Sequence, residues 1–333
     1  MFAYIVKRLL AGFLVVTLIS MMVYALFWYG PRSPAQELCR RESNNRCTPE
    51  KLERYEEALG YNNSVTSEYG KWAKGLVAGR DITVGASVIH CEAPCLGLSY
   101  RTRQPVFEEM KTRLPATISL AVGAASITLT IGVTVGVLAA RRRGTFADKA
   151  LVSTTLFMSS IPYYLFALLS MLYLTIVYDV FPQTGYTPLT DNPGAWFTGL
   201  LLPWLALGFY NSTSYTRFSR GAMVESLSED YIRTARAKGL TSRVVVMRHA
   251  LRAALVPVVT IFGIDFAFLL AGTIFTEKIF DIQGIGRWGL DATLIKDLPV
   301  VQATVLFGSI IIVVANIIVD IIYSILDPRV RLS

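Results

Sequence analysis

Long apolar runs separated by short polar segments dominate this chain. A bilayer-spanning helix needs about 20 mostly apolar residues. Five uncharged stretches reach that length: 9–29, 114–140, 150–178, 192–216 and 298–319. A sixth stretch, 253–276, is long enough but contains Asp265. The pattern predicts an all-α integral membrane protein with six transmembrane helices.

Composition agrees with a membrane protein, because 53% of the residues are hydrophobic and only 17% are charged, against roughly 25% charged in soluble domains. The positions of Lys and Arg in short loops predict the orientation. Basic residues gather before the first predicted helix, after the second, between the fourth and fifth, and in the tail: Lys7, Arg8, Arg141, Arg142, Arg143, Lys149, eight within 217–252, Arg329 and Arg331. The loop 179–191 has none. Both termini are predicted to be cytoplasmic, and the net charge of +8 reflects this bias rather than nucleic-acid binding.

The polar segment 31–113 then lies outside the cytoplasm and separates a first helix (1–30) from a five-helix core (114–333). It holds all four cysteines: Cys39, Cys47, Cys91 and Cys95. Four cysteines in an oxidising compartment suggest two disulfides with three possible pairings. We favour the local pairs, Cys39–Cys47 and Cys91–Cys95. Free thiols are an alternative, and a metal site is less favoured because only His90 could join the thiols.

The N-terminal segment also resembles a cleavable signal peptide, with basic residues, an apolar run and "VYA" at 23–25. Its apolar run is longer than a typical signal core, which favours an uncleaved first span.

Two elements are predicted inside the segment 31–113. Residues 48–60 read as a capped helix that starts at Thr48 and Pro49 and stops at Gly60. Leu52, Tyr55 and Leu59 would give it one buried face. Residues 79–88 are strand-like.

Several catalytic signatures are missing from the sequence. It contains no G-xxxx-G-K-[S/T] for nucleotide hydrolysis and no H-E-xx-H for zinc. "GIGRWG" (284–289) matches G-x-G-xx-G, but a dinucleotide site needs a preceding strand and a βαβ unit. A turn-rich re-entrant loop between the last two helices is the preferred interpretation. The pattern Gly132-xxx-Gly136 is interpreted as a helix-packing surface.

The segment 217–252 is too polar to cross a bilayer. Ser226 or Ser228 is predicted to cap a short helix that ends at Gly239, where a left-handed backbone is tolerated. A second helix begins near Ser242, with Val244, Met247 and Leu251 on one face. A basic loop at an anionic lipid surface is the simpler alternative, but it needs no helix pair or glycine stop. The pair favours docking into another protein.

Here the residues resemble a known family. "YIRTARAKGL…RHALRAALVPVVT" is similar to the cytoplasmic signature of ATP-binding-cassette (ABC) importer permeases of the dipeptide/oligopeptide branch, the B-type subunit. The general pattern E-A-A-xxx-G places Ala235 at its second alanine, and Arg233 and Thr234 replace the glutamate and first alanine. Further matches cover most of 1–29 and 105–333: "RLPAT" (113–117), "IGVTVGVLAA" (131–140), "SSIP" (159–162), "FPQTG" (181–185), "EKIFDIQGIGRWGLDATLIKDLP" (277–299) and "DPRVRL" (327–332).

The resemblance implies the six-helix type I ABC importer permease fold, with an extracytoplasmic insert between the first two helices. It implies a non-catalytic subunit in a bacterial cell membrane, without a cofactor of its own. The partners implied are a second permease, two P-loop ATPases that bind ATP and Mg²⁺, an extracytoplasmic substrate-binding protein and membrane lipid. ATP-driven closure of the ATPases would switch the path between inward-facing and outward-facing states.

The resemblance also assigns candidate site residues. The helix ending at Gly239 would couple to one ATPase through residues of the turn and its flanks: Glu229, Arg233, Thr234, Ala235, Arg236, Lys238, Gly239 and Arg243. An external loop with Gly284, Gly286, Arg287 and Trp288 would meet the binding protein, although ordinary loop packing explains it equally well. Asp265 departs from the apolar residue usual in this family, and as an intramembrane carboxylate it is a candidate for the translocation path, contacting a peptide amino terminus. Asp320 fits a structural pairing better.

Other functions stay open at this point. The permease motifs do not fix the cargo, so an importer of nickel or another small solute of the same branch is possible. An ion channel would leave Ala235–Gly239 without a purpose. A secondary transporter should have inverted repeats, and we find none.

Overall fold

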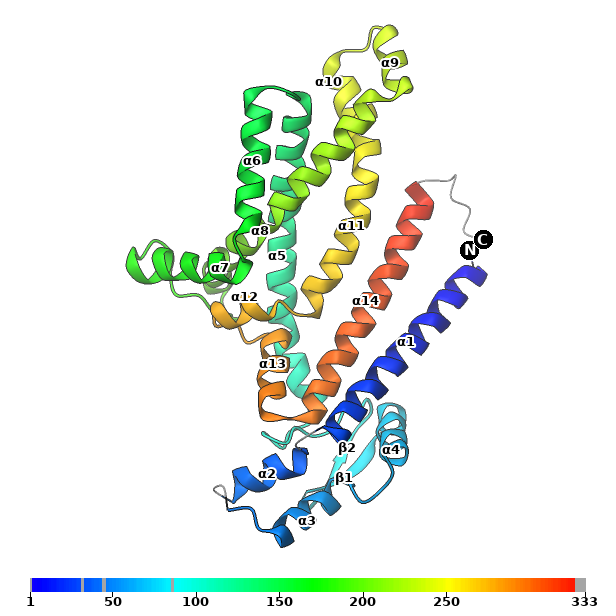
Figure 1. Cartoon of the computed structure of the whole chain (residues 1–333), viewed down its shortest axis with the longest axis vertical. Helices are drawn as coiled ribbons and strands as arrows, with labels where there is room; N and C mark the ends of the chain where they lie inside the picture. Colours follow the sequence, from blue (N-terminus) through cyan, green and yellow to red (C-terminus); the bar gives the residue numbers. More distant parts are fainter. Residues whose placement is uncertain (1, 31–32, 44–45, 85–86, 327–333) are drawn as a thin grey trace. The chain divides into compact units, whose positions relative to one another are not determined.

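The computed structural model describes residues 2–30, 33–43, 46–84 and 87–326, and this part is mostly helical (Figure 1). The predicted tail motif at 327–332, with Arg329 and Arg331, lies outside the described residues. The chain forms two compact units. Unit 1 comprises Met1–Pro115 and Gly284–Val313, and unit 2 comprises Ala116–Gln283 and Val314–Ser333.

Four helical segments of the described residues are long and apolar enough to cross a membrane: Val6–Tyr29, Val106–Arg141, Ser242–Ala271 and Leu298–Ile321. The pair Phe146–Ser160 and Tyr163–Val177 raises the number to five if it is counted as one span. The predicted span at 192–216 lies within one helix, Pro193–Ser228, which is not among the segments that are apolar enough. Six spans therefore remain the expectation from the sequence.

The predicted span at 150–178 is not a single straight helix. Its two parts, α6 (Phe146–Ser160) and α7 (Tyr163–Met171) with η1 (Leu172–Val177), are bent by 89°. Ile161 adopts an extended backbone (ψ 127°), as residues before proline do. Pro162 then serves as the N-cap of α7. The apolar pattern missed this break because both sides of it are apolar.

Unit 1 contains α1 (Phe2–Tyr29), α2 (Pro34–Glu42), α3 (Pro49–Ala58), α4 (Val65–Ala78), the hairpin β1 (Arg80–Val84) and β2 (Ser87–Cys91), and α13 (Ile285–Ile295). It also includes the start of α5 (Val106–Arg141) and most of α14 (Leu298–Leu326). The strand-like segment 79–88 is thus the first half of an antiparallel hairpin, with Arg80 opposite Cys91.

Local chemistry sets the boundaries of the small helices. Ser33, Thr48 and Ser64 are N-cap residues. Each hydroxyl accepts a hydrogen bond from the backbone N–H three residues later in the chain. The predicted stop of α3 is confirmed, because Gly60 has φ +79°. The predicted buried face is wrong: α3 has no buried residue. Leu52, Tyr55 and Leu59 are only half-buried.

An aromatic cluster holds α4 against α1. The Trp28 and Tyr61 rings stack with centroids 4.3 Å apart, and Tyr69 contacts both Tyr24 and Trp72. The Tyr69 hydroxyl also lies 2.6 Å from the hydroxyl of Ser20. The segment with α4 is therefore packed on the C-terminal half of α1 and is not loosely tethered.

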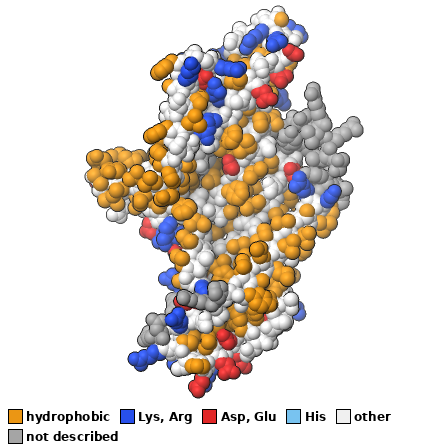
Figure 2. Space-filling model, in the orientation of Figure 1, with side chains coloured by type: hydrophobic (Ala, Val, Ile, Leu, Met, Phe, Trp, Pro, Cys, Tyr) orange, Lys and Arg blue, Asp and Glu red, His pale blue; other side chains and the backbone are white. Residues whose placement is uncertain are grey.

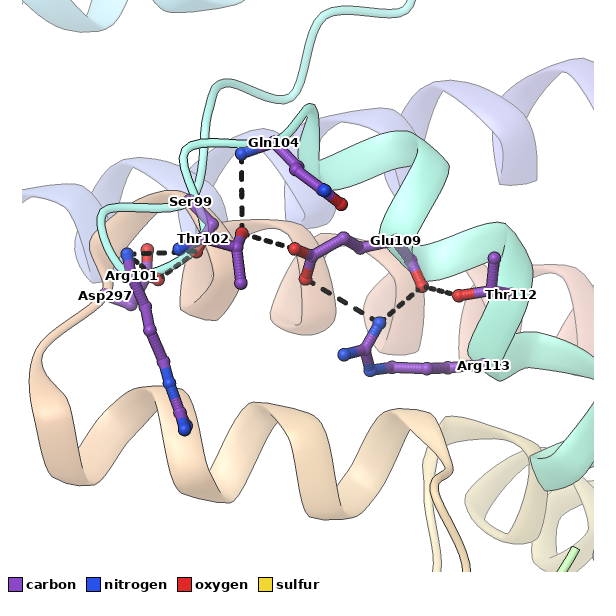
Figure 3. Close-up of polar contacts among 8 residues, drawn as sticks. All are labelled: Ser99, Arg101, Thr102, Gln104, Glu109, Thr112, Arg113 and Asp297. Atoms are coloured by element: carbon purple, nitrogen blue, oxygen red, sulfur yellow. Dashed lines mark hydrogen bonds and ion pairs between the residues drawn. The ribbon is translucent and has the colours of Figure 1, made fainter. Parts of the chain in front are cut away.

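The base of the insert is closed by a polar network (Figure 3). The carboxylate of Asp297, which precedes α14, accepts hydrogen bonds from the Ser99 hydroxyl at 2.5 Å and the backbone N–H of Arg101 at 3.2 Å. Thr102 donates to Glu109 on α5, and Arg113 donates to the backbone carbonyl of Glu109 at 3.0 Å. The end of the insert is thus fastened to both α5 and the start of α14.

Unit 2 contains the rest of α5, then α6, α7, η1, α8 (Pro193–Ser228), α9 (Asp230–Ala237), α10 (Ser242–Val244), η2 (Val245–Ala250), α11 (Leu251–Ala271), α12 (Ile274–Ile279) and the end of α14. The predicted apolar run 253–276 continues past the end of α11, because Gly272 (φ +129°) terminates that helix. In Figure 1, α9 and α10 lie at the opposite end of α11 from α12.

Two glycines bring α5 close to α8, as the Gly-xxx-Gly pattern predicted. A Cβ atom on Gly132 would lie 2.4 Å from the Cβ of Tyr215, and one on Gly136 would lie 2.7 Å from the carbonyl oxygen of Thr216. Both distances are far below van der Waals contact. The two helices therefore pack backbone to backbone at these positions.

The helix α7, which follows the bend, and η1 after it carry many exposed apolar side chains. Figure 2 shows hydrophobic side chains gathered over α7. Tyr164 is 53% exposed, and Ile176 in η1 is 64% exposed. Charged side chains gather instead at the end of unit 2 that carries α9. The polar end and the apolar body fit a helix bundle that stands in a membrane.

Candidate functional site

The helix α8 passes directly into α9, with only Glu229 between them. Glu229 is the N-cap residue, and no side chain caps α9. The prediction that Ser226 or Ser228 caps this helix is therefore wrong. The hydroxyl of Ser228 donates to the carbonyl of Glu225 instead. Serine hydroxyls often bond to a backbone group within their own turn, and this bond takes the place of the predicted cap.

One side of α9 is buried against the neighbouring helices. Ile232 is fully buried and Ala235 is 7% exposed. They pack in one cluster with Met223 of α8 and with Val245 and Val246 of the following helix. The spacing of Ile232 and Ala235, i and i+3, places them on the same helical face. This apolar pair fixes which side of α9 faces outward.

A hydrogen bond joins the end of α8 to the end of η2, the two helices that flank α9 and α10. The hydroxyl of Ser226, at the end of α8, donates to the carbonyl of Ala250 at 2.9 Å and lies 3.0 Å from the hydroxyl of Tyr231. Both Ser226 and Ala250 are buried. This contact could not be predicted from the sequence, because its partners lie 24 residues apart and serine is common in loops.

The turn after α9 is built on Gly239, which has φ +78°. A Cβ atom at Gly239 would meet no neighbour within 4 Å. The requirement for glycine therefore comes from the left-handed backbone alone. The predicted order of short helix, turn at Gly239 and second helix from Ser242 is confirmed.

Most of the predicted docking residues point into solvent. The exposed ones are Glu229, Arg233, Thr234, Arg236, Lys238, Gly239 and Arg243. Ala235 differs, because it lies on the buried face of α9 together with Ile232. Arg233 lies 3.4 Å from Asp230, but its side chain is 77% exposed. An exposed pair of this kind contributes little to stability, about 0–1 kcal/mol, so these charges are available to a partner.

Apolar side chains are interspersed with these charges. Tyr231 is 44% exposed, Leu240 40% and Met247 54%. The face of the second helix predicted from Val244 and Met247 is thus the exposed one, and the neighbouring Val245 is the buried residue. Exposed aromatic and Met side chains together with Arg are enriched in protein interfaces.

Asp265 lies on α11 and is exposed. The hydroxyl of Tyr215, on α8, donates a hydrogen bond of 2.6 Å to its carboxylate. The Tyr215 side chain itself is only 3% exposed. The carboxylate is thus oriented by one buried donor and keeps an open side. Asp320 of α14 is half-buried.

The segment 284–289, predicted to be an external turn-rich loop, is largely helical, because α13 (Ile285–Ile295) begins within it. Gly284 is the N-cap of α13, and Ile285 and Gly286 are buried. Arg287 lies 3.8 Å from Asp291, and the Trp288 ring lies under Arg113 at 4.8 Å. The G-x-G-xx-G match follows α12 in the chain and not a strand, which removes the dinucleotide interpretation. Gly284 and Gly286 are buried. Of the four residues predicted to meet a binding protein, only the half-buried Arg287 and Trp288 are therefore accessible.

The local disulfide pairing is confirmed, with Cys39 bonded to Cys47 and Cys91 bonded to Cys95. His90 does not join the cysteines and instead lies 2.6 Å from Asp81 across the hairpin. Within the described ranges, no group of three or more His, Cys, Asp or Glu side chains could hold a metal ion.

Comparison with known proteins places this arrangement in a family. Residues 132–332 match the family model "Binding-protein-dependent transport system inner membrane component", and residues 1–121 match the model of the N-terminal region of such membrane components. A putative peptide transport system permease protein of Brucella abortus is 35% identical over 99% of both chains.

Two further relatives carry related names. The di/tripeptide transport system permease protein DppB of Pseudomonas aeruginosa is 34% identical over 99% of both chains. The dipeptide transport system permease protein DppB of Escherichia coli is 38% identical over 71% of this chain and 76% of its own.

Among solved structures, the MetNI methionine ABC transporter in inward-facing conformations shares the fold. Its matched chain is 18% identical, with a TM-score of 0.50, and the match covers 67% of this chain and 99% of that chain. The fold, the family models and the full-length relatives agree. This chain belongs to the family of binding-protein-dependent transport system inner membrane components, and it is a multi-pass permease component of an ABC importer.

Proposed function

We propose that this chain imports dipeptides or oligopeptides as one permease subunit of an ATP-driven transporter. The names of its relatives support a peptide cargo. A second, related permease completes the translocation path, and two cytoplasmic ATPases bind and hydrolyse ATP with Mg²⁺. A substrate-binding protein outside the membrane delivers the peptide. The chain itself performs no chemical step and needs no cofactor.

The orientation proposed for the chain follows the basic residues. Both termini are cytoplasmic, and the segment 31–113 is an extracytoplasmic insert. Two disulfides in that segment support this orientation, since disulfides persist in oxidising compartments. Arg287 and Trp288 are the residues proposed to meet the binding protein. The membrane is the remaining partner, and no nucleic acid is proposed.

The observation that carries the proposal is the α9–Gly239–α10 segment. It combines a rigid apolar underside, formed by Ile232 and Ala235, with an exposed face of apolar and charged side chains. Such a segment fits the groove of another protein. It would transmit closure of the ATPases to α8 and α11, which are continuous with its two arms.

Exchanging Gly239 for valine tests this proposal. Valine disfavours the left-handed backbone at φ +78° by about 1–2 kcal/mol and redirects the turn without a steric clash. We expect membrane insertion to be normal and peptide uptake to be lost. Gly221→Val is the control, because Gly221 lies within α8, also has open space, and needs no positive φ. Unchanged uptake in Gly239→Val would refute the coupling assignment.

Isolation of the native complex tests the partners and the cargo. The chain is extracted from its native membrane in mild detergent, and the proteins that accompany it are identified. We expect a second permease and P-loop ATPases, with ATP hydrolysis stimulated by peptide. Stimulation by Ni²⁺ and not by peptide would assign the other cargo, and a chain that purifies alone would contradict the importer assignment.

A further inference from the structure

An ion pair with a buried carboxylate and a half-buried guanidinium joins α6 to α8 near the α9–Gly239–α10 segment, the coupling segment. The guanidinium of Arg220 on α8 meets the carboxylate of Asp148 on α6 through two contacts, Nε to Oδ1 at 2.6 Å and Nη2 to Oδ2 at 2.7 Å. The N–H of Gly144 donates to the same carboxylate at 2.9 Å. Asp148 is only 2% exposed. The pair is bidentate, which fixes direction as well as distance.

A second arginine on the same face of α8 binds the other end of α6. Nη1 of Arg217 donates to the hydroxyl of Ser159 at 2.9 Å and to the carbonyl of Thr155 at 3.2 Å. Arg217 precedes Arg220 by three residues, so both reach the same neighbour. Asp148 and Ser159 are 11 positions apart along α6, which is about 16 Å at 1.5 Å per residue. The two arginines therefore hold α6 at both ends.

The break that follows α6 is also bound to α8. The hydroxyl of Tyr210 donates to the carbonyl of Ile161 at 2.9 Å. Ile161 directly precedes Pro162 and the 89° bend into α7. α8 thus contacts α6 at its first turn, at its last turn and at the bend itself. The other end of α8 continues through Glu229 into α9.

We infer that Asp148, Arg217 and Arg220 are positioning residues that make α6 and α8 one rigid lever between the coupling segment and the α6–α7 bend. The inference rests on the proposed coupling function of α9. A displacement of α9 moves α8, and the two arginines carry α6 and its bend with it. Stability alone explains this pair poorly, because the desolvation of its buried carboxylate offsets much of the attraction between the two charges.

The first experiment uses the complete transporter with its binding protein in liposomes and a mixture of di- and tripeptides as the probe. In Asp148→Asn we expect normal assembly and basal ATP hydrolysis, with peptide-stimulated hydrolysis and uptake about tenfold lower, a typical size for coupling between sites. Arg220→Lys keeps the charge but loses the planar fork, so its loss should be smaller. Glu225→Gln, an exposed change on the same helix, should behave as wild type.

A covalent substitute for the ion pair separates a lever from a merely structural contact. The four native cysteines are all in disulfides, so the variant with Asp148→Cys and Arg220→Cys has two new free thiols. We expect this variant to be uncoupled, and we expect a short bifunctional maleimide that bridges the two thiols to restore stimulated uptake.

Three results would overturn the lever. They are full stimulation in Asp148→Asn, loss of assembly in both Asp148→Asn and Arg220→Lys, and a cross-link that forms but does not restore stimulated uptake. Equal stimulation of wild type and Asp148→Asn would refute the lever alone. A wild-type complex without peptide stimulation would refute the proposed function as well.

Discussion

The hydroxyl of Ser99 donates a hydrogen bond of 2.5 Å to the carboxylate of Asp297, 198 residues later in the chain. The backbone N–H of Tyr100 adds a bond of 3.0 Å to the same carboxylate. Asp297 is 2% exposed. One buried side chain therefore organises the turn at the base of the insert and ties it to the start of α14.

Asp297→Ala should destabilise unit 1 strongly. The buried hydroxyl of Ser99 and the half-buried N–H of Tyr100 would lose their acceptor, at a cost of about 1–3 kcal/mol for a buried group. Ser99→Ala should cost less, because it removes one donor and leaves the others paired. Apparent melting temperatures of the purified protein in detergent measure this order. Asp191→Ala, an exposed change, is the control, and equal melting temperatures for all three variants would contradict the assignment.

Ser226→Ala should loosen the coupling segment. It removes the bond to the carbonyl of Ala250 at 2.9 Å, and a typical intramolecular hydrogen bond contributes about 1 kcal/mol. We expect trypsin to cleave at Lys238 and Arg243 several-fold faster, about fivefold for that free energy. Ser228→Ala is the matched control, since its hydroxyl bonds only to the exposed residue Glu225. Cleavage of both variants at the wild-type rate would contradict a stabilising role for the hydrogen bond between Ser226 and Ala250.

The two disulfides should be reduced in a fixed order. Cys91 and Cys95 are 3% and 1% exposed, whereas Cys47 is half-buried. Thiolate attack requires access to a sulfur atom. Under increasing dithiothreitol, alkylation and mass spectrometry should find Cys39 and Cys47 modified first. Reduction of Cys91–Cys95 before the other pair would contradict the burial of the hairpin end.

Asp265→Asn tests the carboxylate proposed for the translocation path. Without its charge, we expect uptake of peptides with a free amino terminus to fall toward the level of N-acetylated peptides. Tyr215→Phe keeps the charge but removes the hydrogen bond of 2.6 Å, so its effect on selectivity should be weaker. Competition between the two kinds of labelled peptide measures this. Unchanged selectivity in Asp265→Asn would remove Asp265 from the path.

Features that depend on neighbouring residues in the chain were predictable from the sequence. Thr48 and Gly60 bound a helix because a side-chain cap and a left-handed residue act within one turn. Gly239 marks its turn for the same reason. The cysteines pair with the partners only eight and four residues away. The apolar runs at 9–29 and 298–319 each form part of one helix, because an apolar environment requires internally satisfied backbone groups.

The tertiary structure decided what depends on direction and on distant partners. Apolar side chains continue on both sides of Pro162, so hydropathy could not reveal a bend of 89°. Val244 and Val245 are equally apolar, yet only Val245 meets Ile232 and Ala235. Asp148 finds Arg220 across 72 residues. Side-chain type and spacing specify the helices, but the facing helices select which side chain is buried and which charge is paired.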